Sequence, residues 1–184
     1  MKVVVLHGSA REGGDSDTLA DRFLDGFNEI GPHEVTHFRP IAMAIEHCRA
    51  CMRCGSGDGC VIEDDMQAVY PAFCDADVVV LAAPMFWGYM TSQLKTLFDR
   101  LEAIVGRRCF GGKDFVLFVT YRHYYGSIVA WLERIAEGFG SRCHAVTCRT
   151  YDPETGSDLP IATHPRRLQE AEALGRRIGR ERPA

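Results

Sequence analysis

Four cysteines lie within thirteen residues and form the most chemically specific pattern in this sequence. They make two consecutive CxxC steps and then, after a gap of five residues that includes three glycines, a fourth position: Cys48, Cys51, Cys54 and Cys60. Thiolates bind soft metals, and a CxxCxxC run with a fourth cysteine nearby is typical of iron–sulfur clusters. The spacing therefore favours a 4Fe-4S cluster held by these four side chains.

Two other interpretations of the same loop stay open. A structural zinc site made of four cysteines usually has two CxxC pairs set well apart, whereas all four cysteines here share one short loop. The four could also be metal-free thiols that pack together or form disulfides. The remaining cysteines lie in or beside apolar segments, where we expect buried, inert thiols: Cys74, Cys109, Cys143 and Cys148.

A second candidate site is the segment GSAREGGDSDT at residues 8–18. It leads from an apolar run into a helical pattern, so it places the N–H groups of a helix N-terminus beside hydroxyl and guanidinium groups on Ser9, Arg11, Ser16 and Thr18. That combination suits a phosphate group. The segment lacks both GxxxxGK[ST] and GxGxxG, so neither common nucleotide loop is present. The alternative is an ordinary turn capped by Asp15 or Ser16.

Two aromatic segments follow later apolar runs. They are APMFWG at residues 83–88 and TYRHYYG at residues 120–126. Pro84 constrains the first turn, Gly88 permits close approach of a ligand, and the aromatic side chains offer a surface for a planar ring. Any one of these aromatics could simply pack under a neighbouring loop, but three loops that converge on one sheet edge favour a ligand site.

Short β-branched runs alternate with helical apolar stripes along the whole chain. Strands are expected at 2–6, 34–38, 77–82, 115–121 and 145–149, and helical stripes run over 19–30, 66–73, 90–101, 128–135 and 168–178. Three of the strands are near-continuous apolar runs, which is typical of parallel strands buried on both faces. The pattern predicts an α/β, doubly wound, five-stranded parallel sheet in three layers. Ligands of such sheets bind beyond the carboxyl ends of the strands.

Composition bounds the class of protein. The 184 residues, 46% hydrophobic and 25% charged, suit one domain over residues 1–184 with a cysteine-rich loop at about 40–62. A net charge of −4 argues against a nucleic-acid partner. We also expect no membrane span, and the lack of a signal-peptide pattern in a cysteine-rich chain predicts a cytoplasmic location.

Together these motifs resemble the flavodoxin-like NADPH-dependent FMN reductase family, and within it the iron–sulfur flavoproteins. The GSARxGG run resembles the FMN-phosphate loop, the cysteine run followed by VIEDDM resembles the compact cluster motif, and APMFWG resembles the isoalloxazine loop. The resemblance implies a flavodoxin-like domain whose FMN phosphate is held around Ser9, Arg11, Ser16, Asp17 and Thr18. It implies that the flavin ring lies between Pro84, Met85, Phe86, Trp87 and Gly88 on one side and Thr120, Tyr121, His123, Tyr125 and Gly126 on the other.

The chain departs from the family pattern at two of these positions. Asp15 stands where the family commonly has asparagine, and we expect its carboxylate to turn away from a phosphate and cap the first helix. Phe86 replaces a usual tyrosine, which keeps the ring face and removes a hydroxyl. Separately, Asp64 and Gln67 predict a capping box at the start of the second helix.

The resemblance implies a flavin-dependent oxidoreductase that relays electrons between FMN and a 4Fe-4S cluster, with NAD(P)H as a possible donor. No catalytic side chain is expected, because the flavin supplies the chemistry. The partners would be a small-molecule or protein electron donor and acceptor, and we expect a homodimer or homotetramer, which would shield the cluster. The alternatives are a cluster-free NAD(P)H-dependent FMN or quinone reductase, and a passive flavin electron carrier with a structural zinc.

Overall fold

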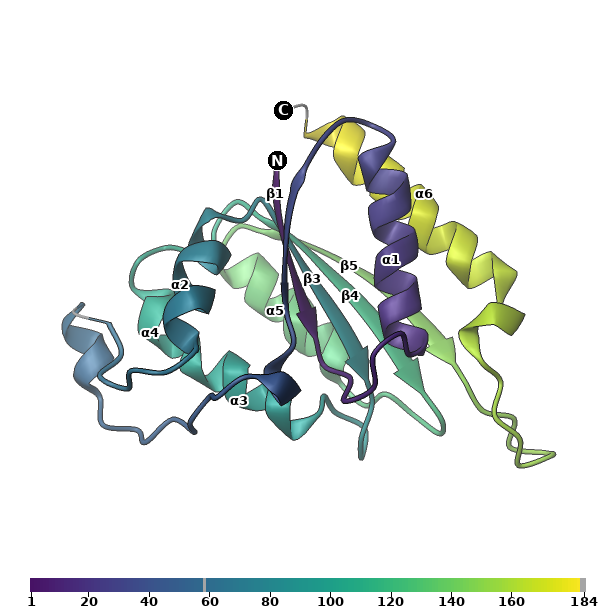
Figure 1. The fold of residues 1–184 in the computed structure, drawn as a ribbon, viewed down its shortest axis with the longest axis horizontal. Coiled ribbons are helices and arrows are strands. Elements are labelled where there is room, and N and C mark those ends of the chain that lie inside the picture. Colours follow the sequence, from purple (N-terminus) through teal and green to yellow (C-terminus); the bar gives the residue numbers. More distant parts are fainter. Residues whose placement is uncertain (58, 183–184) are drawn as a thin grey trace.

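The computed structural model describes residues 1–57 and 59–182, and in them five strands form one parallel sheet (Figure 1). The strand order is β2-β1-β3-β4-β5. The strands are β1 (Lys2–His7), β2 (Glu34–Phe38), β3 (Val78–Pro84), β4 (Asp114–Tyr121) and β5 (Arg142–Arg149). This arrangement confirms the doubly wound prediction, and the order reverses between β1 and β3, where such folds open a crevice.

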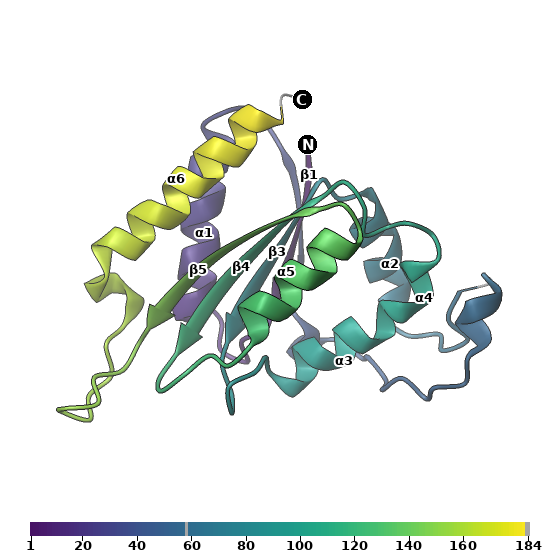
Figure 2. The ribbon, with the colours of Figure 1, turned by 180° about the vertical axis from the view of Figure 1, so that it is seen from behind.

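Helices cover both faces of the sheet (Figures 1 and 2). One face carries α1 (Asp15–Asn28) and α6 (Pro165–Glu181); the other carries α2 (Met66–Asp75), α3 (Ser92–Arg100), α4 (Glu102–Val105) and α5 (Ile128–Gly138). Short 3-10 turns lie at η1 (Pro40–Ala42), η2 (Arg53–Ser56) and η3 (Ile161–Thr163). Among the residues that the structure describes, no helix is both long and apolar enough to pass through a lipid bilayer.

Alternation along β1 shows how the strands divide the core. Val3 and Val5 pack into the cluster beneath α1 and α6, whereas Val4 and Leu6 pack into the cluster beneath the other helices. Because successive strand residues point to opposite faces, a strand covered on both sides must be apolar throughout. The interior strands β1, β3 and β4 are those with the near-continuous apolar runs.

The fifth strand begins three residues earlier than the predicted range of 145–149. Arg142, Cys143 and His144 pair with the first residues of β4. Two of the three are polar, so the apolar pattern did not include them in the predicted strand. The side chains of Arg142 and His144 bond to Asp114, whose carboxylate is buried at the start of β4. The ladder therefore continues through residues whose side chains form ion pairs.

One buried arginine ties the base of the cysteine loop to α3. The Arg100 side chain donates to Asp64 Oδ2 at 2.6 Å and to the carbonyl oxygens of Glu46 and Ile62 at 2.8 and 3.3 Å. Burial alone would raise the pKa of Asp64, but hydrogen bonds from Arg100 and from the N–H groups of Glu46 and Met66 outweigh it and lower that pKa. Both ends of the cysteine loop are thereby fixed to the core.

The same contacts show that the predicted capping box is wrong. The N-cap of α2 is Asp65, without a side-chain cap bond, and Gln67 donates to the Ile62 carbonyl at 3.0 Å. The Asp64 carboxylate is instead occupied by Arg100. A buried cation from a distant helix is not visible in a local four-residue pattern.

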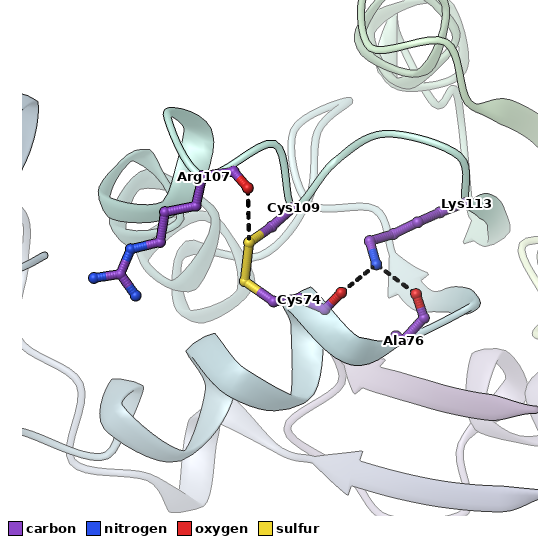
Figure 3. The surroundings of a disulfide bond; sticks show 5 residues. All are labelled: Cys74, Ala76, Arg107, Cys109 and Lys113. Atoms are coloured by element: carbon purple, nitrogen blue, oxygen red, sulfur yellow. Dashed lines mark hydrogen bonds between the residues drawn. A yellow bond between two sulfur atoms is a disulfide. The ribbon is translucent and has the colours of Figure 1, made fainter. Parts of the chain in front are cut away.

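The expectation of inert thiols fails for two cysteines. Cys74 and Cys109 are joined by a disulfide across 35 residues of sequence (Figure 3). Their approach depends on how α2 packs beside the turn before β4, which the spacing of the two residues does not reveal. Cys143 and Cys148 are free, and burial raises the pKa of the Cys143 thiol to about 11.

Because α1 packs closely on α6, a single methyl group added between the two helices should strongly lower the free energy of unfolding. A Cβ at Gly175 would lie 2.1 Å from the Phe23 carbonyl oxygen, so Gly175→Ala must push the helices apart. We expect a loss of at least about 2 kcal/mol in the free energy of unfolding, measured by urea denaturation. Gly138→Ala in α5 is the control, because its Cβ meets open space. Equal stability of the two variants would contradict the packing argument.

The buried pair on α3 yields a second prediction. Arg100→Met leaves the Asp64 carboxylate buried without its cation, which should cost about 3–5 kcal/mol of unfolding free energy. Lys95→Met on the same helix breaks an exposed pair with Asp99 and should cost less than about 1 kcal/mol. Urea denaturation of both variants checks this, and similar losses would show that the buried pair has no special role.

Candidate functional site

A cavity of about 550 Å³ lies beyond the carboxyl ends of the strands, where the loops after β1, β3, β4 and β5 meet. This is the edge at which the strand order reverses between β1 and β3. The residues that line the cavity are Ser9, Arg11, Gly14, Asp15, Ser16, Pro84, Met85, Phe86, Trp87, Gly88, Thr120, Tyr121, Arg122, His123, Tyr124 and Thr150. The three loops singled out in the sequence thus surround one space.

Most of the residues that the sequence suggested for FMN line this cavity, but four do not. Those four are Asp17, Thr18, Tyr125 and Gly126, and each has another place in the structure. Thr150, which sequence reasoning missed, follows β5 at the same edge. The other loops were located because each follows the carboxyl end of a parallel strand. The same rule, applied to the fifth strand, would have identified Thr150.

The loop after β1 is folded so that a helix N-terminus opens into the cavity. Ser9 Oγ donates to the Arg11 carbonyl oxygen at 2.8 Å and accepts from the Arg11 N–H at 3.0 Å, which closes a tight turn. Gly13 has a φ of 64°, and Gly14 is the N-cap of α1 with no side chain bonded across the helix end. The first N–H groups of α1 are therefore not capped by a side chain, which suits an anion.

Asp17 supports this loop from beneath. Its carboxylate accepts hydrogen bonds from His7 Nδ1 at 2.9 Å, from Arg39 Nη2 at 2.9 Å and from the Gly13 N–H at 3.1 Å. Burial alone would raise the pKa of Asp17, but the hydrogen bonds from His7 and Arg39 outweigh it and lower that pKa. Asp17 is 2% exposed and lies outside the cavity lining. Its carboxylate therefore bonds to groups of the protein and does not face the cavity.

Two neighbours of Asp17 also differ from expectation. Thr18 Oγ1 donates to the Gly14 carbonyl oxygen at 3.2 Å, within the first turn of α1. Asp15 does not cap α1, because Gly14 already holds that position and Asp15 is the first residue of the helix. Its Oδ1 accepts from the Ile161 N–H at 2.8 Å, so Asp15 anchors the segment between β5 and α6.

The loop after β3 is a tight hairpin that presents an aromatic side chain. Phe86 and Tyr89 exchange backbone hydrogen bonds of 2.9 and 3.0 Å, and the two residues between them have φ values of 52° and 77°. Two positive φ values are the geometry of a type I′ hairpin turn. Trp87, at the first of these positions, is 96% exposed at the cavity mouth.

The loop after β4 packs directly against this hairpin. A Cβ at Gly88 would lie 2.2 Å from Cε2 of Tyr124, and a Cβ at Gly126 would lie 2.2 Å from the Gly88 carbonyl oxygen. The group that lies close to Gly88 is therefore the Tyr124 ring of the protein, and not a ligand. Tyr125 turns inward and packs on Tyr121, with ring centroids 5.0 Å apart. These contacts explain why Tyr125 and Gly126 lie outside the cavity lining.

The cysteine loop leads away from the sheet beyond α4 (Figure 1). Cys48 and Cys51 are exposed, and Cys54 and Cys60 are half-buried. Within residues 1–57 and 59–182, no three His, Cys, Asp or Glu side chains are grouped so that they could hold a metal ion. In this structure the four thiols are therefore not grouped around one point.

Comparison with known proteins gives matches in sequence and in fold. The sequence profile of the family described as NADPH-dependent FMN reductase matches residues 1–141. An iron–sulfur flavoprotein of Methanosarcina thermophila is 34% identical over 114 residues, which are 62% of this chain and 59% of the relative. One from Archaeoglobus fulgidus is 30% identical over 131 residues, which are 71% of this chain and 54% of that protein.

Among solved structures, an azoreductase from Bacillus anthracis str. Sterne aligns with a TM-score of 0.74 at 19% identity, over 96% of this chain and 99% of that one. At this identity the likeness shows the fold alone. The chain spans little more than half the length of the two curated relatives. The profile match, which covers most of the chain and both loops that open the cavity after β1 and β3, shows that the chain belongs to the NADPH-dependent FMN reductase family.

Proposed function

We propose that this chain is an FMN-dependent oxidoreductase and that its flavin binds in the cavity at the carboxyl edge of the sheet. The observation that carries the proposal is the continuity of one 550 Å³ cavity from the N-terminus of α1 to two aromatic loops. One end suits a phosphate and the other a planar ring. When bound, FMN supplies the hydride and electron transfer.

The phosphate end of the proposal rests on the loop after β1. Ser16 is in the first turn of α1, and Ser9 and Arg11 line the same end of the cavity. A guanidinium and the N–H groups of a helix start both stabilise a dianion. Asp17 and Arg39 hold the loop in this form, because Arg39 also donates to the Ser9 carbonyl oxygen at 3.3 Å.

The ring end rests on the loops after β3 and β4. Met85 donates its N–H to the Thr120 carbonyl oxygen at 2.8 Å, so the ladder between the two strands continues to the cavity floor. Phe86, Trp87 and Tyr124 are 63%, 96% and 58% exposed, and they offer apolar surface that a flavin would cover. His123 lines the same cavity and packs edge-on against Tyr151. These residues position the ring and exclude water.

NAD(P)H as donor, and a small molecule or protein as acceptor, are part of the proposal. Support comes from the family to which the chain belongs and from the open, apolar mouth of the cavity. We also propose a homodimer or homotetramer in the cytoplasm. Met52, which is 80% exposed and lies outside the flavin cavity, is the kind of apolar side chain that a second subunit covers.

We further propose that Cys48, Cys51, Cys54 and Cys60 hold a 4Fe-4S cluster. Support comes from their spacing and from relatives named iron–sulfur flavoproteins. The loop must rearrange to bring the four thiols together, since no such group exists among the described residues. That observation favours a second candidate, a cluster-free FMN or quinone reductase, and metal analysis separates the two.

The phosphate assignment predicts a selective effect of Arg11→Ala. Losing one charge-assisted hydrogen bond of about 1.5–3 kcal/mol should weaken FMN binding roughly 10- to 100-fold. Riboflavin, which lacks the phosphate, should bind the variant and the parent alike. Fluorescence titration with both flavins checks this, with Arg22→Ala on the exposed face of α1 as the control. An equal loss for both flavins, or no loss for FMN, would contradict the assignment.

The cluster proposal predicts that the four loop cysteines act as one set. In protein prepared without oxygen, Cys54→Ser should lose most of its iron and sulfide per chain and keep its FMN, because the two sites are separate. Cys143→Ser, at a free cysteine in β5, is the control and should keep its iron. Iron, sulfide and zinc assays on each variant provide the measurement. A parent protein without iron would leave the cluster-free reductase as the function.

A further inference from the structure

A second cavity, of about 420 Å³, brings three cysteines together away from the flavin cavity. Cys60, Cys74 and Cys109 all line it, beside Tyr70 and Arg107. Two of the three are already joined in the Cys74–Cys109 disulfide, and Cys60 is a free thiol. A thiol and a disulfide that share one cavity are the reactants of thiol–disulfide exchange.

The disulfide joins two segments at the amino edge of the sheet. Cys74 lies in the last turn of α2, and Cys109 lies in the turn between α4 and β4. Buried Lys113 holds this end of α2, because its Nζ donates to the carbonyl oxygens of Cys74, at 2.8 Å, and of Ala76 (Figure 3). These two hydrogen bonds fix the backbone that carries Cys74 at the end of α2.

Arg107 connects the disulfide with the segment that carries Cys60. Its carbonyl oxygen is 3.9 Å from Cys109 Sγ, while its side chain extends away from the bridge (Figure 3). The guanidinium reaches Gly59, since a Cβ built on that glycine would lie 3.1 Å from Arg107 Nη2. One residue thus spans the gap between the bridge and the neighbour of Cys60, and it brings a cation to the cavity.

We propose that Cys60 and the Cys74–Cys109 bridge form a thiol–disulfide exchange site. The Cys60 thiolate attacks Cys109 Sγ, a Cys60–Cys109 bond forms, and the Cys74–Cys109 bond breaks with its electron pair on Cys74 Sγ. One thiolate is consumed and one is produced, so no external oxidant or reductant is needed. The site requires neither flavin nor metal and goes beyond the proposed function.

Exchange changes what the cysteine loop can do. A Cys60–Cys109 bond ties that loop covalently to the turn between α4 and β4, and it withdraws Cys60 from the set of four. Small thiols and their disulfides are the chemical class that would enter or leave this site. Because the internal exchange leaves the number of disulfides unchanged, the loop can switch between an untied and a tied form without a change in the oxidation state of the chain.

The test uses glutathione disulfide with the folded Cys74→Ser protein, with a chelator present so that no metal occupies Cys60. Glutathione disulfide first forms a mixed disulfide on Cys109. Cys60 should then displace glutathione and leave a Cys60–Cys109 bond, whereas the Cys74→Ser/Cys60→Ser protein should keep the adduct. Cys74→Ser/Cys54→Ser is the matched control and should resolve the adduct like Cys74→Ser. Circular dichroism establishes that all three variants are folded.

Mass spectrometry of non-reduced digests identifies the bonds. Cleavage at Arg53 and Lys95 leaves Cys54 and Cys60 on one peptide, so a second cleavage at Asp58 is needed to tell them apart. We expect at least a tenfold excess of the Cys60–Cys109 bond over the glutathione adduct in Cys74→Ser. An adduct that persists equally in Cys74→Ser and in Cys74→Ser/Cys60→Ser would overturn the proposal. That outcome is independent of whether the chain binds FMN.

Discussion

The reversal of strand order between β1 and β3 is the constraint on which the rest of this structure depends. The chain leaves β1 toward α1 on one face of the sheet and leaves β3 toward α3 on the other, so the two loops diverge and a crevice opens between them. Every group in the proposed flavin site reaches that crevice from the carboxyl end of a strand. The loops after β4 and β5 extend it, and the loop after β5 contributes Thr150.

A buried carboxylate converts this crevice into a shaped site. Asp17 accepts from His7 at the end of β1, from Arg39 just after β2 and from Gly13 in the loop itself. Three segments are thereby held at one point, and the N-terminus of α1 stays open. Since all of these groups are protein-bound, the loop is organised before any ligand arrives, which reduces the entropic cost of binding.

The sequence predicted the elements and the cavity much better than the roles of individual polar residues. Apolar runs and helical stripes report burial directly, so the central strands and the loops that follow them could be located. Asp17, Asp64 and Asp15 were misassigned because their partners, Arg39, Arg100 and the Ile161 N–H, come from distant segments. Capping rules consider only residues a few positions apart in the sequence, so they cannot detect partners from distant segments. The Cys74–Cys109 bond was missed for the same reason, since it depends on tertiary approach.

A crystal structure of the chain grown with FMN would test the central claim most directly. We expect the phosphate at the N-terminus of α1, within hydrogen-bond distance of Ser9, Arg11 or the first N–H groups of the helix. We expect the isoalloxazine ring at the other end of the same cavity, against the side chains presented by the loops after β3 and β4. Flavin bound at another edge of the sheet, or a cavity that stays empty at saturating FMN, would contradict it.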